Sequence, residues 1–269
     1  MTRWTTTLTI ATMITLSTAT TTGALGTAHA EASLPTLAPT PPDALRHQLV
    51  EHRGVTMSQL FTSREPGETT SYRKKTRAEF GKGTVLATDV RERGPSDPLR
   101  YLTFKGRLYC QGWICPAPEG KTWVLISENA RTRPFLQSDG IDLASPETLR
   151  AILSTATTKQ PGGVYDHTRT TLYQGTLTFG RLYAISPAFR DQHHTAKPTG
   201  KYAKAKLSWQ LWLGADRLPR RLKTSWSEKL GERLITHTVD ARLIGWGTKT
   251  TIPLPSPEDT AGPNDWRDS

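Results

Sequence analysis

Hydrophobic residues alternate with polar ones over much of the chain, and turn residues interrupt the alternation at short intervals. The alternating segments cover about residues 54–62, 71–80, 84–93, 99–104, 107–111 and 121–126. Gly81-Lys82-Gly83 and Lys105-Gly106 lie between neighbouring segments, as at the turns of β-hairpins. Because successive side chains of a strand point to opposite faces, this pattern predicts an antiparallel meander.

A helix is predicted to interrupt the strands, opening at Ser145. Ser145 is a suitable N-cap and Pro146 suits the first helical position. An apolar stripe at helical spacing follows, made of Leu149, Ile152 and Leu153. Pro161-Gly162-Gly163 is expected to end this helix.

Strand-like segments return after that helix, at about residues 170–179, 207–213, 218–227 and 234–244. Leu182–Phe189 reads as a short helical or irregular piece, and Asp43 can cap another short helix that runs to about His52. The fold class is therefore α+β, in one domain over residues 43–257. A flexible lead-in over 31–42 and a disordered tail over 258–269 flank this domain.

The first thirty residues have the features of an export signal. Arg3 supplies the positive start, Leu8–Leu25 is moderately apolar, and Ala28-His29-Ala30 is a small-x-small cleavage pattern. We expect cleavage after Ala30 and a secreted or extracytoplasmic protein. The alternative is an uncleaved anchor helix, for which the apolar stretch is short and rich in threonine.

The composition excludes several classes of protein. Eight tryptophans and a mixed charge of 35 Lys and Arg against 24 Asp and Glu argue against a disordered chain. The positive charges are dispersed; the densest cluster is Arg73-Lys74-Lys75 with Arg77, which is typical of a solvated strand face. Nucleic-acid binding is therefore not expected.

Two cysteines, Cys110 and Cys115, are the whole complement of the chain. In an oxidising compartment they are expected to form one local disulfide. The alternative, a redox-active pair, normally has two intervening residues rather than four.

No sequence motif identifies a catalytic centre, so we do not predict an enzyme. His193-His194 beside Asp191 lack a third metal ligand at a telling spacing, and no metal or cofactor is expected. Asp166, His167 and Ser186 contain hydrolase residue types, but the chain has no G-x-S-x-G elbow. Asp216 is interpreted as a turn residue.

Several segments resemble the actinobacterial LppX/LprG-like exported proteins, which share the fold of the periplasmic lipoprotein carrier LolA. The resemblance covers about residues 54–255. Its segments are Trp209-Gln-Leu-Trp-Leu-Gly-Ala-Asp-Arg-Leu-Pro-Arg-Arg-Leu-Lys-Thr, Asp240-Ala-Arg-Leu-Ile-Gly-Trp-Gly-Thr-Lys-Thr-Thr-Ile-Pro-Leu-Pro, Gly106-Arg-Leu-Tyr, Lys121-Thr-Trp-Val-Leu-Ile and Thr171-Leu-Tyr-Gln-Gly-Thr-Leu.

This resemblance implies an open half-barrel, a single curved antiparallel sheet whose concave face is covered by helices. In such proteins the space between sheet and helices can hold acyl chains. The chain departs from the pattern because no lipoprotein cysteine lies near the cleavage pattern, so no lipid anchor is expected.

The predicted function is an exported, non-catalytic protein that binds or carries a lipid or other amphiphile in an apolar cavity. The alternative is a structural or interaction module of the cell envelope with a filled core. The candidate cavity residues are Val55, Met57, Leu60, Phe80, Leu86, Leu102, Phe104, Leu149, Leu153, Phe179, Trp209 and Leu211. We further expect a monomer and peripheral contact with an anionic membrane or cell wall.

Overall fold

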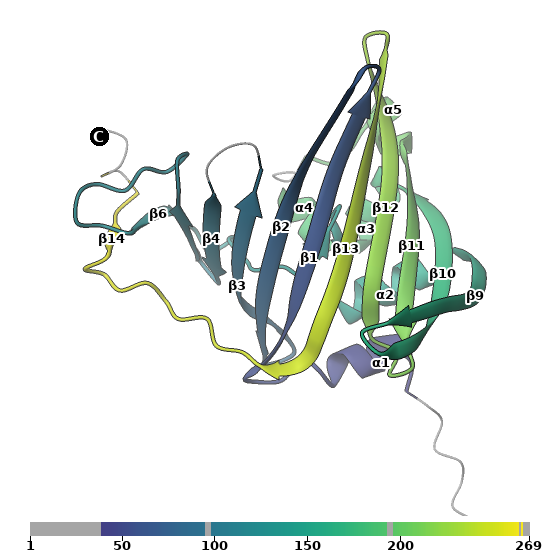
Figure 1. The fold of residues 1–269 in the computed structure, drawn as a ribbon, viewed down its shortest axis with the longest axis horizontal. Coiled ribbons are helices and arrows are strands. Elements are labelled where there is room, and N and C mark those ends of the chain that lie inside the picture. The colour runs from purple at the N-terminus through teal and green to yellow at the C-terminus, as the bar shows by residue number, and fades with distance from the viewer. Residues whose placement is uncertain (1–38, 95–97, 193–195, 264, 266–269) are drawn as a thin grey trace, which may run out of the picture. The chain divides into compact units, whose positions relative to one another are not determined.

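The main element of the fold is one large β-sheet. The computed structural model describes residues 39–94, 98–192, 196–263 and 265. Within these residues, twelve strands form an open sheet in the order β14-β6-β5-β4-β3-β2-β1-β13-β12-β11-β10-β9 (Figure 1). The strands are β1 (Arg53–Glu65), β2 (Glu68–Gly81), β3 (Thr84–Arg93), β4 (Leu99–Phe104), β5 (Arg107–Gln111), β6 (Trp123–Glu128), β9 (Ala156–Tyr165), β10 (Thr168–Thr178), β11 (Lys206–Gly214), β12 (Pro219–Leu230), β13 (Arg233–Lys249) and β14 (Thr260–Ala261).

The sheet is almost entirely antiparallel, because most neighbouring strands follow one another along the chain. Two pairings join strands that are distant in the chain, β1 with β13 and β6 with β14. Met57 lies opposite Leu243 and Phe61 opposite Val239 in the first of these pairs. β14 pairs with β6 in parallel. The predicted α+β class with one open, curved antiparallel sheet is confirmed.

Helices lie against one face of the sheet, here called the inner face; the opposite face is called the outer face (Figure 1). The helices are α1 (Pro41–Arg46), α2 (Pro146–Leu153), α3 (Phe179–Ile185), α4 (Pro187–Gln192) and α5 (Gly200–Lys204). A small hairpin of β7 (Gln137–Ser138) and β8 (Ile141–Asp142) accompanies them. Alternation along β1 sends Val55 and Met57 to the inner face, where both are buried with side chains of these helices.

The helix predicted at Ser145 begins as expected. The Ser145 hydroxyl accepts a hydrogen bond from the Thr148 backbone N–H at 3.0 Å, and Pro146 occupies the first turn. The end of this helix was wrongly predicted. α2 stops at Leu153, and Pro161-Gly162-Gly163 lies within β9, at the edge of the sheet, where proline is tolerated because no ladder partner needs its missing N–H.

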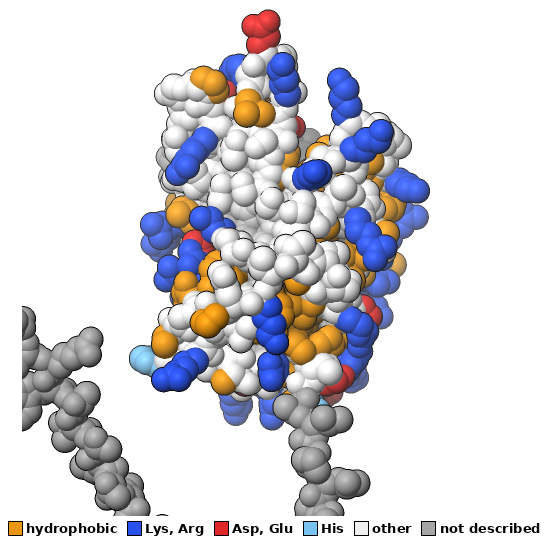
Figure 2. Space-filling view, turned by 90° about the vertical axis from the view of Figure 1, so that its right-hand side faces the viewer, with side chains coloured by type: hydrophobic (Ala, Val, Ile, Leu, Met, Phe, Trp, Pro, Cys, Tyr) orange, Lys and Arg blue, Asp and Glu red, His pale blue; other side chains and the backbone are white. Residues whose placement is uncertain are grey.

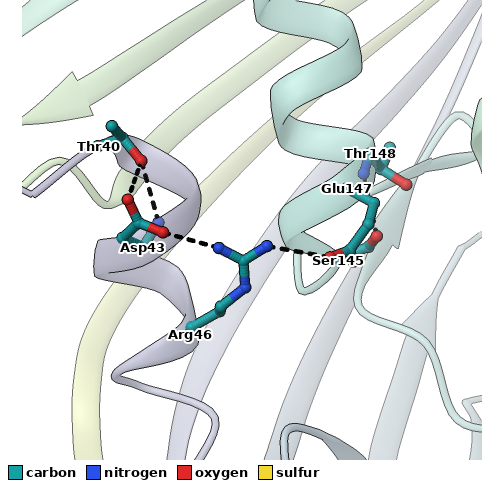
Figure 3. A network of polar contacts seen from close by, with 6 residues as sticks. All are labelled: Thr40, Asp43, Arg46, Ser145, Glu147 and Thr148. Carbon is teal, nitrogen blue, oxygen red and sulfur yellow. Dashed lines mark hydrogen bonds and ion pairs between the residues drawn. The ribbon is translucent and has the colours of Figure 1, made fainter.

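The first helix also starts and ends earlier than predicted. α1 is capped by Thr40 rather than Asp43, and two prolines occupy its first turn, so the expected lead-in over 31–42 ends before Pro42, which is buried. Arg46 donates to the Asp43 carboxylate at 2.7 Å and to Glu147 at 3.2 Å, joining α1 to the start of α2 (Figure 3). The predicted signal segment, residues 1–30, lies outside the described residues.

The predicted disordered tail is wrong for its first residues. After β13 the chain crosses the sheet to reach β14, and residues 250–262 are here called the C-terminal strap (Figure 1). The Ile252 N–H donates to the Glu79 carboxylate at 2.7 Å, and the Asp259 carbonyl accepts from the backbone N–H groups of Thr122 and Trp123. These bonds hold the strap because they pair backbone N–H and C=O groups that in a free tail would be hydrogen-bonded to water.

Candidate ligand sites

The space between the inner face and the helices is filled by side chains. A single cluster of buried residues extends from α1 through β1, β2, α2, α3 and α4 to β11, β12 and β13. Trp209 is its largest fully buried side chain, and its indole N–H lies 3.3 Å from the Thr155 hydroxyl oxygen. Trp209 also lies directly over Gly175, where even a Cβ would come within 2.6 Å of the indole ring.

The predicted cavity residues divide between the two faces. The structure brings eight of them together in or against the inner cluster: Val55, Met57, Phe80, Leu149, Leu153, Phe179, Trp209 and Leu211. Leu102 and Phe104 instead belong to a separate cluster on the outer face of β3–β6, under Ile252 of the strap. Leu60 and Leu86 are 36% exposed.

The four misplaced residues have two physical reasons. Leu60 alternates with the inner-face residues Gln59 and Phe61, so it lies on the outer face. In β3, Val85 pairs with Phe80 and Ala87 with Glu79, so Leu86 is the extra residue of a β-bulge. The bulge puts Ala87 on the outer face, and the register places Phe104 and Leu102 on that same face.

An aromatic cleft opens on the inner face where the long strands extend beyond the helices. It has a volume of about 230 Å³ and is lined by Phe61, Tyr72, Trp226, His237 and Val239, together with Asp139 and four residues with hydroxyl side chains, Thr62, Ser63, Thr70 and Thr238. The rings of Phe61 and Tyr72 stack with centroids 4.5 Å apart, and those of Trp226 and His237 stack at 4.2 Å. Tyr72 is 41% exposed, so the cleft is open to solvent.

Asp139 places a carboxyl group at this cleft. It occupies a two-residue turn with Gly140, both residues having positive φ (49° and 76°), between the paired Ser138 and Ile141. Asp-Gly is a strong hairpin signal, so this turn is the feature that could have revealed β7–β8 from the sequence, which the prediction missed. The Thr224 hydroxyl donates to the Asp139 carboxylate at 2.7 Å.

The ionisation of Asp139 is set by opposing effects. Burial raises the pKa of this carboxyl above its ordinary value, while hydrogen bonds from the Thr224 and Trp226 side chains and the charge of His237 lower it. The cleft thus combines stacked aromatic rings with a few polar side chains, among them the Asp139 carboxyl group, which is the composition of many small-molecule sites.

The candidate hydrolase residues do not form a triad. Ser186 is buried between α3 and α4, where its hydroxyl donates to the Gly140 carbonyl at 2.6 Å. Asp166 and His167 occupy the turn between β9 and β10, and Asp166 lies 3.6 Å from Arg220. Asp216 accepts from the Leu218 N–H and pairs with Arg220, which confirms its turn role.

No group of three or more His, Cys, Asp or Glu side chains among the described residues could hold a metal ion. The predicted histidine pair, His193-His194, lies outside the described residues.

The predicted disulfide between Cys110 and Cys115 is present, with Cα atoms 6.2 Å apart. Both cysteines are buried and pack with Val124 of β6 and Ala261 of β14. The disulfide therefore supports the edge of the sheet where the strap ends. In the part of the chain that the structure describes, no helix has the length and apolar character needed to cross a membrane.

Comparison with known proteins gives likeness in structure alone. No family model matches the sequence, and no curated protein does. Among solved structures, LprF from Mycobacterium bovis is 15% identical with a TM-score of 0.47, covering 80% of this chain and 95% of that one. A LolA superfamily protein from Nitrosomonas europaea is 14% identical with a TM-score of 0.30, covering 80% and 96%.

A DUF1329 family protein from Desulfovibrio piger is also similar, at 12% identity and a TM-score of 0.29, covering 79% of this chain and 93% of that one. The architecture itself rests on the strand order and the placement of the helices described above.

Proposed function

We propose that this protein is exported and binds a lipid or another amphiphile without transforming it. The observation that supports this proposal is the aromatic cleft, in which Phe61, Tyr72 and Trp226 present ring surface to solvent on the inner face. Exposed aromatic surface in a concave site is what an apolar chain requires. Each methylene that leaves water there contributes about 0.8 kcal/mol before ordering costs.

Further apolar side chains lie near the cleft. Alternation along β12 gives Glu228 and Leu230 the same face as Trp226; Leu230 is 60% exposed, and Glu228, which lies between them, pairs with His237 at 3.1 Å. On the other side, the Phe179 ring lies 5.1 Å from that of Trp226. A chain longer than the cleft can therefore rest on these apolar side chains, with its polar end near Asp139.

The remaining expectations form part of the same proposal. The protein is released by cleavage after Ala30, has no lipid anchor and acts as a monomer. Its excess of basic side chains favours peripheral contact with an anionic membrane or cell wall.

A second candidate function is supported by the filled interior. Trp209, Phe80 and Phe189 are among the largest fully buried side chains, and they occupy the space where an acyl chain would lie in a hollow carrier. A structural or interaction module of the cell envelope needs no such hollow.

Titration with a fluorescent fatty acid tests the first function and separates it from the second. The purified exported chain should show saturable uptake, and native mass spectrometry of the same preparation should detect co-purified amphiphile. Phe61→Ser with Tyr72→Ser should weaken uptake about ten-fold or more, equivalent to about 1.4 kcal/mol.

The matched control replaces two exposed apolar residues elsewhere, Val164→Ser with Leu254→Ser, and should retain the affinity of the unmodified protein. Equal weakening in both variants would reject the cleft as the site. Absence of uptake by the unmodified protein, together with its retention on isolated cell envelopes, would favour the interaction module.

A further inference from the structure

A hollow on the outer face of the sheet is lined chiefly by basic side chains. It is centred on β1, has a volume of about 660 Å³, and is here called the basic groove. Its residues are Ser58, Gln59 and Leu60 of β1, Arg73, Lys74 and Lys75 of β2, Arg91 and Arg93 of β3, and Asp240 and Arg242 of β13.

The strand register explains the shape of this groove. Ser58 lies between Lys75 on β2 and Arg242 on β13, and Leu60 lies between Arg73 and Asp240. A serine flanked on both sides by long side chains leaves a depression above β1. The predicted cluster Arg73-Lys74-Lys75 is split by alternation, since Lys74 turns to the inner face and pairs with Glu92 at 3.4 Å.

Most of the positive charge in the groove is not neutralised by the protein. The acidic group in its lining, Asp240, is bound by Arg221, whose Nε lies 2.8 Å from Asp240 Oδ1. Arg91 lies 3.5 Å from Asp89, which Arg100 already holds at 2.9 Å. Within the described residues no ion pair involves four of the groove's cations: Arg73, Lys75, Arg93 and Arg242.

The register also places like charges opposite one another. The directly opposed pairs are Arg73 with Arg93, Lys75 with Arg91, Arg91 with Arg100, and Arg221 with Arg242. Like charges directly opposite one another destabilise a sheet. A bound anion would offset this repulsion, so the arrangement is suited to a ligand more than to stability.

Basic side chains are also numerous elsewhere on the surface. On the side of the molecule shown in Figure 2, Lys and Arg side chains lie among neutral and hydrophobic ones. In the groove, the register aligns basic side chains of β13, β2 and β3 around the floor formed by β1.

The groove continues along the sheet toward β4. A second hollow of about 420 Å³ shares Arg91 and Arg93 with it and extends to Arg100 and Gln111. Neither lining contains an aromatic residue, so nothing is available to stack on a nucleic-acid base. A bilayer surface is flat and would not enter two adjoining hollows.

We propose that the basic groove binds an extended, non-aromatic polyanion that carries phosphate groups at intervals along its chain. Arginine guanidinium groups bind phosphate through paired N–H donors, and four of the five cations that line the outer-face hollow are arginines. Such a chain places one phosphate between Lys75 and Arg242 and others near Arg73 and Arg93. This proposal is independent of the amphiphile site, which lies on the inner face.

Isothermal titration of the purified exported chain with inorganic polyphosphate tests the proposal. We expect saturable binding that weakens as salt rises, because phosphate contacts release counterions. The variant Arg73→Gln/Lys75→Gln/Arg242→Gln should bind about ten-fold or more weakly. The control Lys105→Gln/Arg131→Gln/Lys204→Gln removes the same charge from exposed positions elsewhere and should change the affinity less than about two-fold.

Thermal unfolding checks that the groove variant folds, and its Tm should equal or exceed that of the unmodified protein because like-charge pairs are removed. Ser58→Glu is a second test, since one carboxylate on the groove floor should also weaken binding about ten-fold. Equal losses in the groove and control variants would overturn the proposal. Tighter binding of single-stranded DNA or of phosphatidylglycerol vesicles than of polyphosphate would also overturn it.

Discussion

The two halves of the sheet are covered by different means. Strands β1, β2 and β9–β13 bury their inner face under helices and the β7–β8 hairpin. Strands β3–β6 bury their outer face under the strap, where Ile252 packs on Ala87, Leu102, Tyr109 and Trp123. At the edge of this half, Cys110 and Val124 on the inner face pack with Cys115 and Ala261. The helix-covered half has a large continuous core, and the strap-covered half has smaller clusters.

This difference shows how one long sheet can serve two purposes. The helices leave the outer face of the central strands free. The strap contacts β2 at Glu79, and its Ile252 packs on that face from β3 onward. The basic groove lies between these covered regions, at Ser58 and Leu60 of β1. The aromatic cleft lies on the other face, where the long strands extend past the helices.

The largest effect is expected from the core of the helix-covered half. Trp209→Ala should reduce the free energy of unfolding by about 3–5 kcal/mol, because a fully buried indole is replaced by a cavity. Urea denaturation measures this loss. Val164→Ala, at a 65% exposed position, is the control and should change stability by less than about 0.5 kcal/mol.

The Trp209 result also bears on the proposed function. A loss below about 1 kcal/mol would contradict the filled interior, because a side chain that only lines a hollow gives up fewer contacts. A hollow interior would in turn favour an acyl chain under the helices rather than at the aromatic cleft.

Sequence reasoning predicted the strands and turns better than it predicted which face of the sheet each side chain occupies. The segments 84–93, 99–104 and 107–111 became β3, β4 and β5 with unchanged bounds, since Gly, Lys-Gly and Pro turns mark their ends. The Ser145 cap and the disulfide also depend on neighbouring residues. These features could be predicted because their physical causes lie within a few positions of each other.

The candidate site depended on contacts between distant parts of the chain. Phe61 and Trp226 share a cleft only because β1 pairs with β13 and β13 with β12. Ser58 lies between Lys75 and Arg242 for the same reason. Alternation in a single strand cannot give this register, and the bulge at Glu79–Phe80 changes the phase again.

Two buried aspartates allow a second comparison between the halves. Asp142 of β8, in the helix-covered half, has no cation partner among the described residues. Burial raises the pKa of this carboxyl to about 7. The hydrogen bond from the Ala144 N–H lowers that pKa, and the charge of Glu147 raises it. Burial would also raise the pKa of Asp89 of β3, but hydrogen bonds and charge from Arg100 and Arg91 hold that pKa below its ordinary value.

These shifts predict opposite effects of pH. The folded pKa of Asp142 exceeds the unfolded value of about 3.9, so stability should fall as pH rises from about 4 to 7. Asp142→Asn should therefore stabilise the protein at pH 8, by roughly 2–3 kcal/mol, and little at pH 4. The lowered pKa of Asp89 stabilises the fold above the unfolded pKa, and this stabilisation is lost as the pH falls through the folded pKa. Asp89→Asn should therefore lower the free energy of unfolding at pH 7 and change it less near pH 3.

Denaturation curves at pH 3, 4, 7 and 8 measure both effects, and the unmodified protein supplies the reference at each pH. Glu51→Gln, at an exposed position, is the control for removing one carboxylate and should show little change across this range. Destabilisation of Asp142→Asn at pH 8 would contradict an unpaired, buried carboxyl at this position.

The smallest effect is expected from the strap. Ile252→Ala should cost about 2 kcal/mol, because the small outer cluster loses its covering side chain. Hydrogen exchange should quicken in β4, β5 and β6 while β1 and β13 keep their protection, since the two halves have separate cores. Leu254→Ala, 49% exposed in the same strap, should leave both halves unchanged. Uniform loss of protection across all strands would show that the strap supports the whole sheet, and the division into two separately covered halves would then fail.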